Sequence, residues 1–268
     1  MSGLLPRPLG GLPPRQGDGV SKGEKRSSPL CTGKFRAVLF DLDGTLVDTL
    51  PDIAAAMNGA LEEFGLRTLD AAQVGAFIGK GPRVLARRVL DSQRTLGADA
   101  REHLVEPLLA AYLRHYEMQI GKRGQIFPGV LDCLRELSAR GLKLGVVTNA
   151  LQHLAEAILA RFAIAPYLQI VLGGDRVSRH KPHPEPLWEA CRALDVAPHL
   201  ALMVGDSSND VAAAHAAGCA VVCVPHGYNE GQPTHALGCD IIEDFAALPA
   251  WVSAQERRSF ALCSDDTN

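Results

Sequence analysis

Two aspartates, separated by a single residue, come directly after a short apolar run. Residues 37–40 read Ala-Val-Leu-Phe, and the chain continues with Asp41 and Asp43, followed by Gly44 and Thr45. The apolar run predicts a buried strand that delivers both carboxylates to its end. Buried carboxylates are costly unless paired, hydrogen-bonded or metal-bound, and a divalent cation is the simplest solution. On its own, the pair is equally compatible with a solvated turn.

The order of predicted secondary-structure elements in the second half of the chain indicates how these acids are positioned. Apolar strand patterns alternate there with amphipathic helical patterns, which implies a parallel sheet covered on both faces. The predicted strands are 37–40, 142–148, 168–172, 201–205, 220–224 and 240–242. The predicted helices cover 130–137, 151–162, 184–194 and 209–217. We therefore expect an α/β fold, a Rossmann-like doubly wound parallel sheet.

Polar residues follow three of these predicted strands. Asp41 and Asp43 follow the first, Thr148 and Asn149 follow the second, and the segment 206–210 (Asp-Ser-Ser-Asn-Asp) follows a third. Ligands of open parallel sheets bind at the carboxyl ends of the strands, so the three clusters should converge on one crevice.

The region between the first two clusters has a different character. Helical patterns occupy 51–64, 71–78, 82–90 and 100–120, and no strand signal interrupts them. We expect an all-helical cap at 50–125, inserted into a core made of 34–49 and 126–250. Residues 1–33 are rich in Pro, Gly, Ser and basic residues, which is typical of a disordered tail, and 251–268 is expected to be a second tail.

Composition excludes several classes of protein. The 268 residues are 47% hydrophobic with a formal net charge of −3, which suits a globular protein without a basic footprint for nucleic acid. The sequence contains no run of about 18 apolar residues, so a membrane span is not expected. Seven cysteines, an odd number without a CxxC pair, favour reduced thiols in the cytoplasm over disulfides or a zinc cluster.

Four motifs in order give the chain a strong resemblance to a known family. The Asp41–Thr45 segment, Thr148-Asn149, Lys181 and the segment 205–210 resemble the motifs of the haloacid dehalogenase superfamily. The resemblance covers roughly residues 36–245, and the helical insert is similar to that superfamily's small helical cap.

The resemblance implies a magnesium-dependent phosphomonoester hydrolase that acts through an aspartyl-phosphate. Asp41 would be the nucleophile, and Asp43 would protonate the leaving oxygen and then deprotonate the hydrolytic water. Three further residues would contact the phosphoryl group: Thr148, Asn149 and Lys181. Mg²⁺ would be held by Asp41, Asp206 and the backbone carbonyl of Asp43. Residues expected to position this machinery are Asp210, Thr45 and Ser207.

Each motif also has an alternative interpretation. Asn149 could cap the helix at 151–162, and Asp206–Asp210 could cap the helix at 209–217. Lys181 could be a surface lysine. A dehalogenase would lack the second acid, so Asp43 argues for phosphoryl transfer, and a binding protein without catalysis would be expected to have lost Asp41 or Asp43.

The cap carries the signals for substrate. Lys80, Gly81 and Arg83 lie in a Gly-rich turn that opens a helix and could hold an anion, although an ordinary loop explains the turn equally well. This turn, 181–184 and 227–229 resemble bacterial phosphoglycolate phosphatases, which implies a small phosphorylated metabolite as partner. The alternatives are another small phosphate ester or a mutase that transfers phosphate to a sugar. A monomer or a homodimer is expected.

Overall fold

The computed structural model describes residues 35–255. The predicted tail at 1–33 and residues 256–268 lie outside this range. Residues 248–255 are helical, so the predicted start of the C-terminal tail at 251 is wrong for 251–255. Phe245 and Leu248 are fully buried, which ties this end of the chain to the core.

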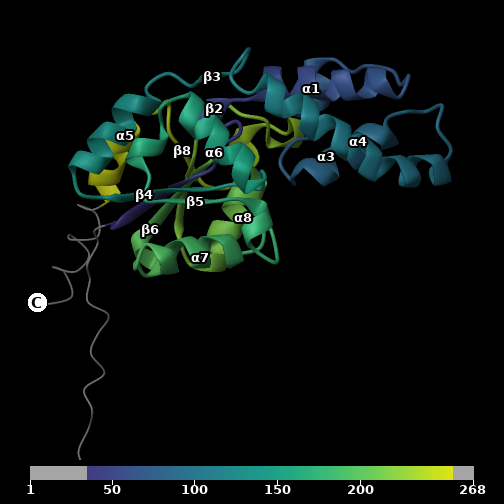
Figure 1. The fold of residues 1–268 in the computed structure, drawn as a ribbon. Helices are drawn as coiled ribbons and strands as arrows, with labels where there is room; N and C mark the ends of the chain where they lie inside the picture. The colour runs from purple at the N-terminus through teal and green to yellow at the C-terminus, as the bar shows by residue number, and fades with distance from the viewer. Residues whose placement is uncertain (1–34, 256–268) are drawn as a thin grey trace, which may run out of the picture. The chain divides into compact units, whose positions relative to one another are not determined.

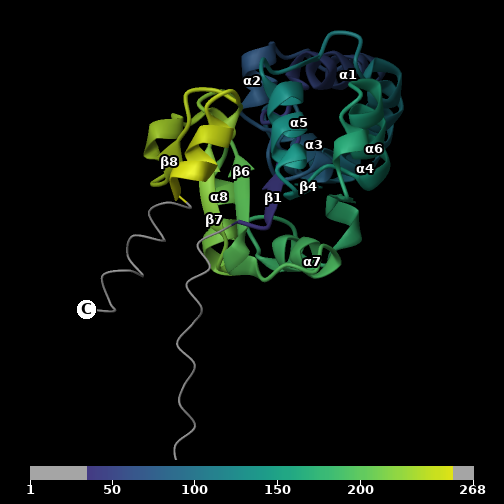
Figure 2. The ribbon, with the colours of Figure 1, turned by 90° about the vertical axis from the view of Figure 1, so that its left-hand side faces the viewer.

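A six-stranded parallel sheet forms the centre of the fold, in the order β5-β4-β1-β6-β7-β8. Its strands are β1 (Ala37–Phe40), β4 (Lys143–Val147), β5 (Ile170–Leu172), β6 (Ala201–Gly205), β7 (Ala220–Cys223) and β8 (Asp240–Ile241). Figure 2 shows them side by side from β8 to β4. Because β1 lies between β4 and β6, three strand ends meet at one edge.

Helices cover both faces of this sheet (Figure 1). Those of the core are α5 (Val130–Ala139), α6 (Gln152–Arg161), α7 (Glu185–Ala193) and α8 (Ser208–Ala217). Val38 and Phe40 belong to the hydrophobic cluster that contains α5 and α6 residues, whereas Ala37 and Leu39 pack with α7 and α8. Strand side chains alternate between faces, so a four-residue strand supports both layers. The predicted doubly wound α/β core is confirmed.

Four helices form the cap between the first strand and the rest of the core: α1 (Leu50–Glu63), α2 (Ala71–Gly75), α3 (Pro82–Asp91) and α4 (Ala98–Gln119). They gather beyond one end of the sheet (Figure 1). Two short strands, β2 (Val47–Asp48) and β3 (Gln125–Ile126), pair antiparallel where the chain enters and leaves the cap. Sequence reasoning missed them, because two residues show no periodicity.

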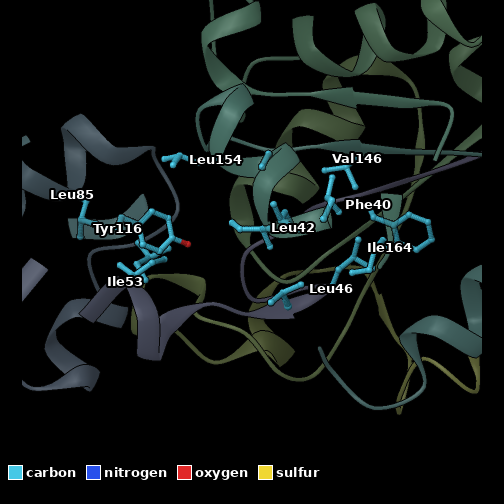
Figure 3. Close-up of a cluster of buried hydrophobic side chains, with 14 of the residues drawn as sticks. Phe40, Leu42, Leu46, Ile53, Leu85, Tyr116, Val146, Leu154 and Ile164 are labelled. Carbon is cyan, nitrogen blue, oxygen red and sulfur yellow. The ribbon is translucent and has the colours of Figure 1, made fainter. Parts of the chain in front are cut away.

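One hydrophobic cluster runs from the core into the cap. Phe40, Leu42 and Leu46 on the core side are continuous with Ile53 and Tyr116 on the cap side (Figure 3). Shared burial of apolar surface holds the two parts against one another.

Short 3₁₀ turns connect the larger elements. They are η1 (Ala165–Tyr167), η2 (Gly174–Arg176), η3 (Pro198–Leu200), η4 (Asn229–Gly231) and η5 (Thr234–Ala236). Within residues 35–255, no helix combines the length and apolar character needed to cross a membrane.

Candidate active site

The three polar clusters that the sequence placed after strands do meet at one edge of the sheet. Asp41 follows β1, Thr148 follows β4 and Asp206 follows β6, and these strands are neighbours in the sheet. Together with the cap they enclose a single pocket that all three residues line.

Lys181 is buried in the centre of this cluster. Its side chain is 1% exposed, and Nζ lies 2.9 Å from Asp41 Oδ1 and 2.7 Å from Asp210 Oδ1. Nζ also donates to Val147 O at 2.7 Å, so each of its three protons has an acceptor. Burial alone would lower the lysine pKa, but the charges of Asp210 and Asp41 raise it, which keeps the amine charged. The interpretation of Lys181 as a surface residue is wrong.

Asp41 has one carboxylate oxygen occupied and one open. Oδ1 contacts Lys181 and accepts the Leu42 N–H at 2.8 Å, whereas Oδ2 has no hydrogen-bond partner among residues 35–255. Burial raises the pKa of Asp41, against the attraction of Lys181. An oriented carboxylate with one free oxygen that faces a pocket has the geometry of a nucleophile.

Asp43 lines the same pocket two residues later. Its Oδ1 accepts a hydrogen bond from Thr49 Oγ1 at 2.6 Å. Burial raises its pKa, while the Thr49 hydroxyl opposes the shift. A raised carboxyl pKa suits a group that must both give and take a proton.

Asp206 is held by two donors. Thr45 Oγ1 donates to Oδ1 at 2.9 Å, and the Tyr228 backbone N–H donates to Oδ2 at 2.8 Å. Burial and then the charge of Asp210 raise its pKa to about 7. Gly227, with φ of +116°, leaves the room that this carboxylate fills, because a Cβ there would overlap it.

Asp210 contributes to two structures at once. Oδ2 accepts from Ser207 Oγ at 2.7 Å and completes a capping box at the start of α8, while Oδ1 contacts Lys181. The helix-capping alternative therefore explains one oxygen of Asp210, and the predicted contact with Lys181 explains the other.

Asn149 holds Lys181 and the cap. Its Nδ2 donates to Lys181 O at 2.9 Å and to Gly79 O at 2.8 Å, and Oδ1 accepts Lys181 N–H at 3.0 Å. Both amide protons are used, so the prediction that this side chain donates to a phosphoryl group is not met in this structure. It does not cap α6 either, since the N-cap of that helix is Leu151. Thr148 Oγ1 accepts Ala150 N–H at 3.1 Å, and its own proton remains available to a ligand.

The acidic side chains outnumber the cation. Asp41, Asp206 and Asp210 each offer an oxygen, and the three oxygens lie within 4.8 Å of one another. Lys181 is the one buried cationic side chain in the described residues. Hard carboxylate oxygens with excess negative charge fit a divalent cation such as Mg²⁺. Both oxygens of Asp210 already contact Lys181 or the start of α8, both oxygens of Asp206 accept neutral donors, and Asp41 keeps one oxygen open.

The cap closes the pocket with a mainly apolar wall. Its contributing residues are Ile53, Ile78, Gly79, Gly81, Pro82, Leu85, Tyr112 and Tyr116. The facing core residues include Asp41, Asp43, Thr148, Asn149, Asp206, Ser207, Tyr228 and Asn229.

Two of the cap residues predicted to bind substrate do not line this pocket. Arg83 forms an ion pair with Glu106 within the cap, at 2.6 Å, and its side chain is 60% exposed. Lys80 Nζ lies 3.4 Å from Oε1 of Glu230, which belongs to η4 of the core. Carboxylates outside the pocket attract both cations in this structure, and their contact with substrate stays a prediction. Gly81 does line the pocket.

Comparison with known proteins agrees with this geometry. Residues 38–224 match the profile of the haloacid dehalogenase-like hydrolases. The chain belongs to this family. It is 43% identical to a plasmid-encoded phosphoglycolate phosphatase of Cupriavidus necator over 216 residues, which cover 80% of this chain and 91% of that protein. It is 40% identical to the phosphoglycolate phosphatase of Nitrosospira multiformis over 208 residues, which cover 78% and 91%.

Solved structures share this fold. A predicted phosphoglycolate phosphatase from Haemophilus somnus 129pt has a TM-score of 0.75 and 35% identity, over 81% of this chain and 97% of that one. CbbY from Rhodobacter sphaeroides, solved in complex with phosphate, has a TM-score of 0.69 and 25% identity, over 80% and 96%. The predicted membership of the haloacid dehalogenase superfamily and the resemblance to phosphoglycolate phosphatases are confirmed.

Sequence reasoning missed several residues of this hydrolase site. Thr49 orients Asp43, and Tyr112 and Tyr116 line the same pocket from the cap. The four-residue spacing of the tyrosines puts them on one face of α4, which was a usable signal. Nothing local marks Glu230, whose role depends on contacts with the cap.

Proposed function

We propose that this hydrolase converts phosphoglycolate to glycolate and phosphate through a covalent intermediate on Asp41. One observation carries the proposal: the free oxygen of Asp41 faces the pocket while Lys181 holds the other oxygen. The 40% to 43% identity to phosphoglycolate phosphatases supports this substrate.

The reaction has two steps. Asp41 Oδ2 attacks phosphorus as the bond between phosphorus and the glycolate oxygen breaks, and Asp43 gives its proton to that oxygen. Asp43 then takes a proton from water, whose oxygen attacks phosphorus and releases phosphate from Asp41. The raised pKa of Asp43 supports the proton-donating role in the first step.

The surrounding residues hold the phosphoryl group and balance charge. Lys181 offsets repulsion between the anionic nucleophile and the anionic substrate, and the Thr148 hydroxyl donates to a phosphoryl oxygen. Asp41, Asp206 and the backbone carbonyl of Asp43 would hold Mg²⁺, which neutralises the charge on the phosphoryl oxygens when bound. Asp210 positions Lys181, and Thr45 positions Asp206.

The test compares phosphate release from phosphoglycolate and from p-nitrophenyl phosphate, with and without Mg²⁺. We expect a clear preference for phosphoglycolate, and Asp41→Asn should lower kcat at least about 10³-fold. The matched control is Asp132→Asn, because Asp132 is an exposed carboxylate on α5. Activity that survives Asp41→Asn would contradict the covalent mechanism, and equal turnover of the two esters by the unmodified protein would contradict the substrate.

A further inference from the structure

Tyr112 and Tyr116 carry the two hydroxyls of the cap side of the pocket. They lie one turn apart on α4, and their rings stack with centroids 5.5 Å apart and an interplanar angle of 13°. Both residues are only 3% exposed. The cap side chains around them, Ile53, Ile78 and Leu85, are apolar.

Neither hydroxyl has a hydrogen-bond partner among residues 35–255, although a buried tyrosine hydroxyl usually has one. Tyr228 illustrates the usual case, since its hydroxyl donates to Asp48 Oδ1 at 3.0 Å and accepts Leu50 N–H at 2.8 Å. In the described chain, the one fully enclosed side-chain polar atom without a partner is Arg101 Nε. The hydroxyls of Tyr112 and Tyr116 therefore open into the pocket that both residues line.

Tyr112 and Tyr116 line the same pocket as Asp43, the proposed catalytic acid. Figure 3 shows the Tyr116 ring beside Ile53 and Leu85, with its oxygen directed toward Leu42, the residue between the two aspartates of the first motif. Burial and then the charge of Asp43 raise the pKa of both tyrosines, so both hydroxyls stay protonated and can donate. A leaving group protonated by Asp43 would lie between that acid and these donors.

Cationic side chains of the cap are engaged elsewhere. Arg83 pairs with Glu106 and Arg87 with Glu102, while Lys80 and Arg88 both contact Glu230. None of these four cations lines the pocket. The cap therefore meets the far end of a bound substrate with neutral donors.

We propose that the hydroxyls of Tyr112 and Tyr116 bind the carboxylate of the leaving group as a pair of neutral hydrogen-bond donors and thereby set substrate selectivity. This proposal rests on phosphoglycolate hydrolysis as the function. A short leaving group with an acceptor at its end satisfies both donors, whereas an alkyl end of the same length leaves them unpaired. Selectivity against such analogues is strong because unpaired polar groups are costly.

The test measures kcat/KM of Tyr112→Phe, Tyr116→Phe and the double variant for phosphoglycolate and for ethyl phosphate, which lacks the carboxylate. We expect each substitution to lower kcat/KM for phosphoglycolate about tenfold or more, and to leave kcat/KM for ethyl phosphate unchanged or higher because the unpaired hydroxyl is gone. Tyr167→Phe is the matched control, because Tyr167 lies in η1 and does not line the pocket. It should change neither value.

Three outcomes separate the possibilities. An equal loss with both esters would overturn the proposal in favour of a packing role for the rings, and unchanged kinetics would also overturn it. If the unmodified protein prefers another ester of a wider panel, the proposed function fails. In that case, phenylalanine variants that lose the preference for that other ester would still support Tyr112 and Tyr116 as selectivity residues. Variants that keep the preference would overturn the proposal.

Discussion

Asn149 and Lys181 are joined by two reciprocal hydrogen bonds: Asn149 Oδ1 accepts the Lys181 N–H at 3.0 Å, and Asn149 Nδ2 donates to Lys181 O at 2.9 Å. The residues are 32 positions apart in the chain. The amide therefore fixes the backbone from which the lysine side chain reaches Asp41. Its second proton goes to Gly79 O in the cap, so one side chain couples the site to the cap.

Asn149→Asp should lower kcat/KM for phosphoglycolate. The substitution replaces the Nδ2 donor by an oxygen that faces two carbonyl oxygens, and we expect a loss on the order of 10- to 100-fold from a displaced Lys181 and a weakened cap contact. The chain offers a matched control in Asn58, which makes the same reciprocal pair with Leu69 N–H and Leu69 O inside the cap. Asn58→Asp should lower Tm but leave kcat/KM within about twofold. Similar kinetic losses in both variants would argue against a specific role for Asn149.

Lys181→Met should lower both activity and thermal stability. Removal of the one cation leaves Asp41 and Asp210 buried without their partner, and breaking a buried pair of this kind costs about 3–5 kcal/mol. We expect a lower Tm together with a fall in kcat of at least about 100-fold. Lys122→Met, at an exposed position, is the control for loss of a lysine. An unchanged Tm would show that the acids do not depend on Lys181 for their burial.

Asp206→Asn should stabilise the metal-free protein and remove its response to Mg²⁺. The substitution deletes one negative charge beside Asp41 and Asp210, while the Thr45 hydroxyl can reverse and accept from the new amide. We expect a rise of roughly 2–4 °C in Tm for each kcal/mol of repulsion removed. In the unmodified protein, Mg²⁺ should raise Tm with concentration, because a ligand that binds only the folded state stabilises it. A thermal-shift titration in EDTA and in Mg²⁺ checks both, and a variant that still responds to Mg²⁺ would contradict the assignment of Asp206.

Glu230 connects the core to the cap, and Glu230→Gln should weaken closure. Its Oε1 lies 2.9 Å from Arg88 Nη2 and 3.4 Å from Lys80 Nζ. With this charge removed, the closed state is less populated, and the apparent affinity for substrate falls in proportion. We expect KM for phosphoglycolate to rise about three- to tenfold with a smaller change in kcat.

The control for closure is Glu102→Gln, which breaks an ion pair to Arg87 that lies entirely within the cap. KM should stay within about twofold in that variant, since exposed pairs contribute little. Equal effects of the two substitutions would exclude a specific link between Glu230 and cap closure.

His226 should make the fold sensitive to mild acid. Its ring stacks on Phe127 with centroids 3.8 Å apart, and Nε2 lies 3.2 Å from Thr45 O. Burial lowers its pKa, so the folded state favours the neutral ring and binds fewer protons than the unfolded chain. This contribution to stability is present above the unfolded pKa of 6.5 and is lost as pH falls below it.

The pH dependence is measured as the fall in Tm between about pH 7.5 and about pH 5.5. His226→Gln keeps an N–H donor for Thr45 O but cannot titrate, so its fall should be smaller than in the unmodified protein. His153→Gln, at a side chain that is 56% exposed, is the control. Identical slopes for the protein and His226→Gln would refute this contribution.

The sequence by itself determined the family, the parallel sheet and the position of Asp41, Thr148 and Asp206 at strand ends. These features are local, because apolar runs predict strands and the residue after a run lies at its end. Lys181 was predicted through the resemblance, since its own neighbours do not distinguish it from a surface lysine.

Only the tertiary structure decided how the site is held and what faces the substrate. Asn149 hydrogen-bonds to Lys181 and Gly79, and Arg83 forms an ion pair with Glu106. Each of these contacts joins residues far apart in the chain. Such contacts depend on which residues the tertiary fold brings together, and local sequence does not determine that. The open hydroxyls on the cap wall have the same origin, because the spacing of two tyrosines places them on one helix face but does not say what that face meets.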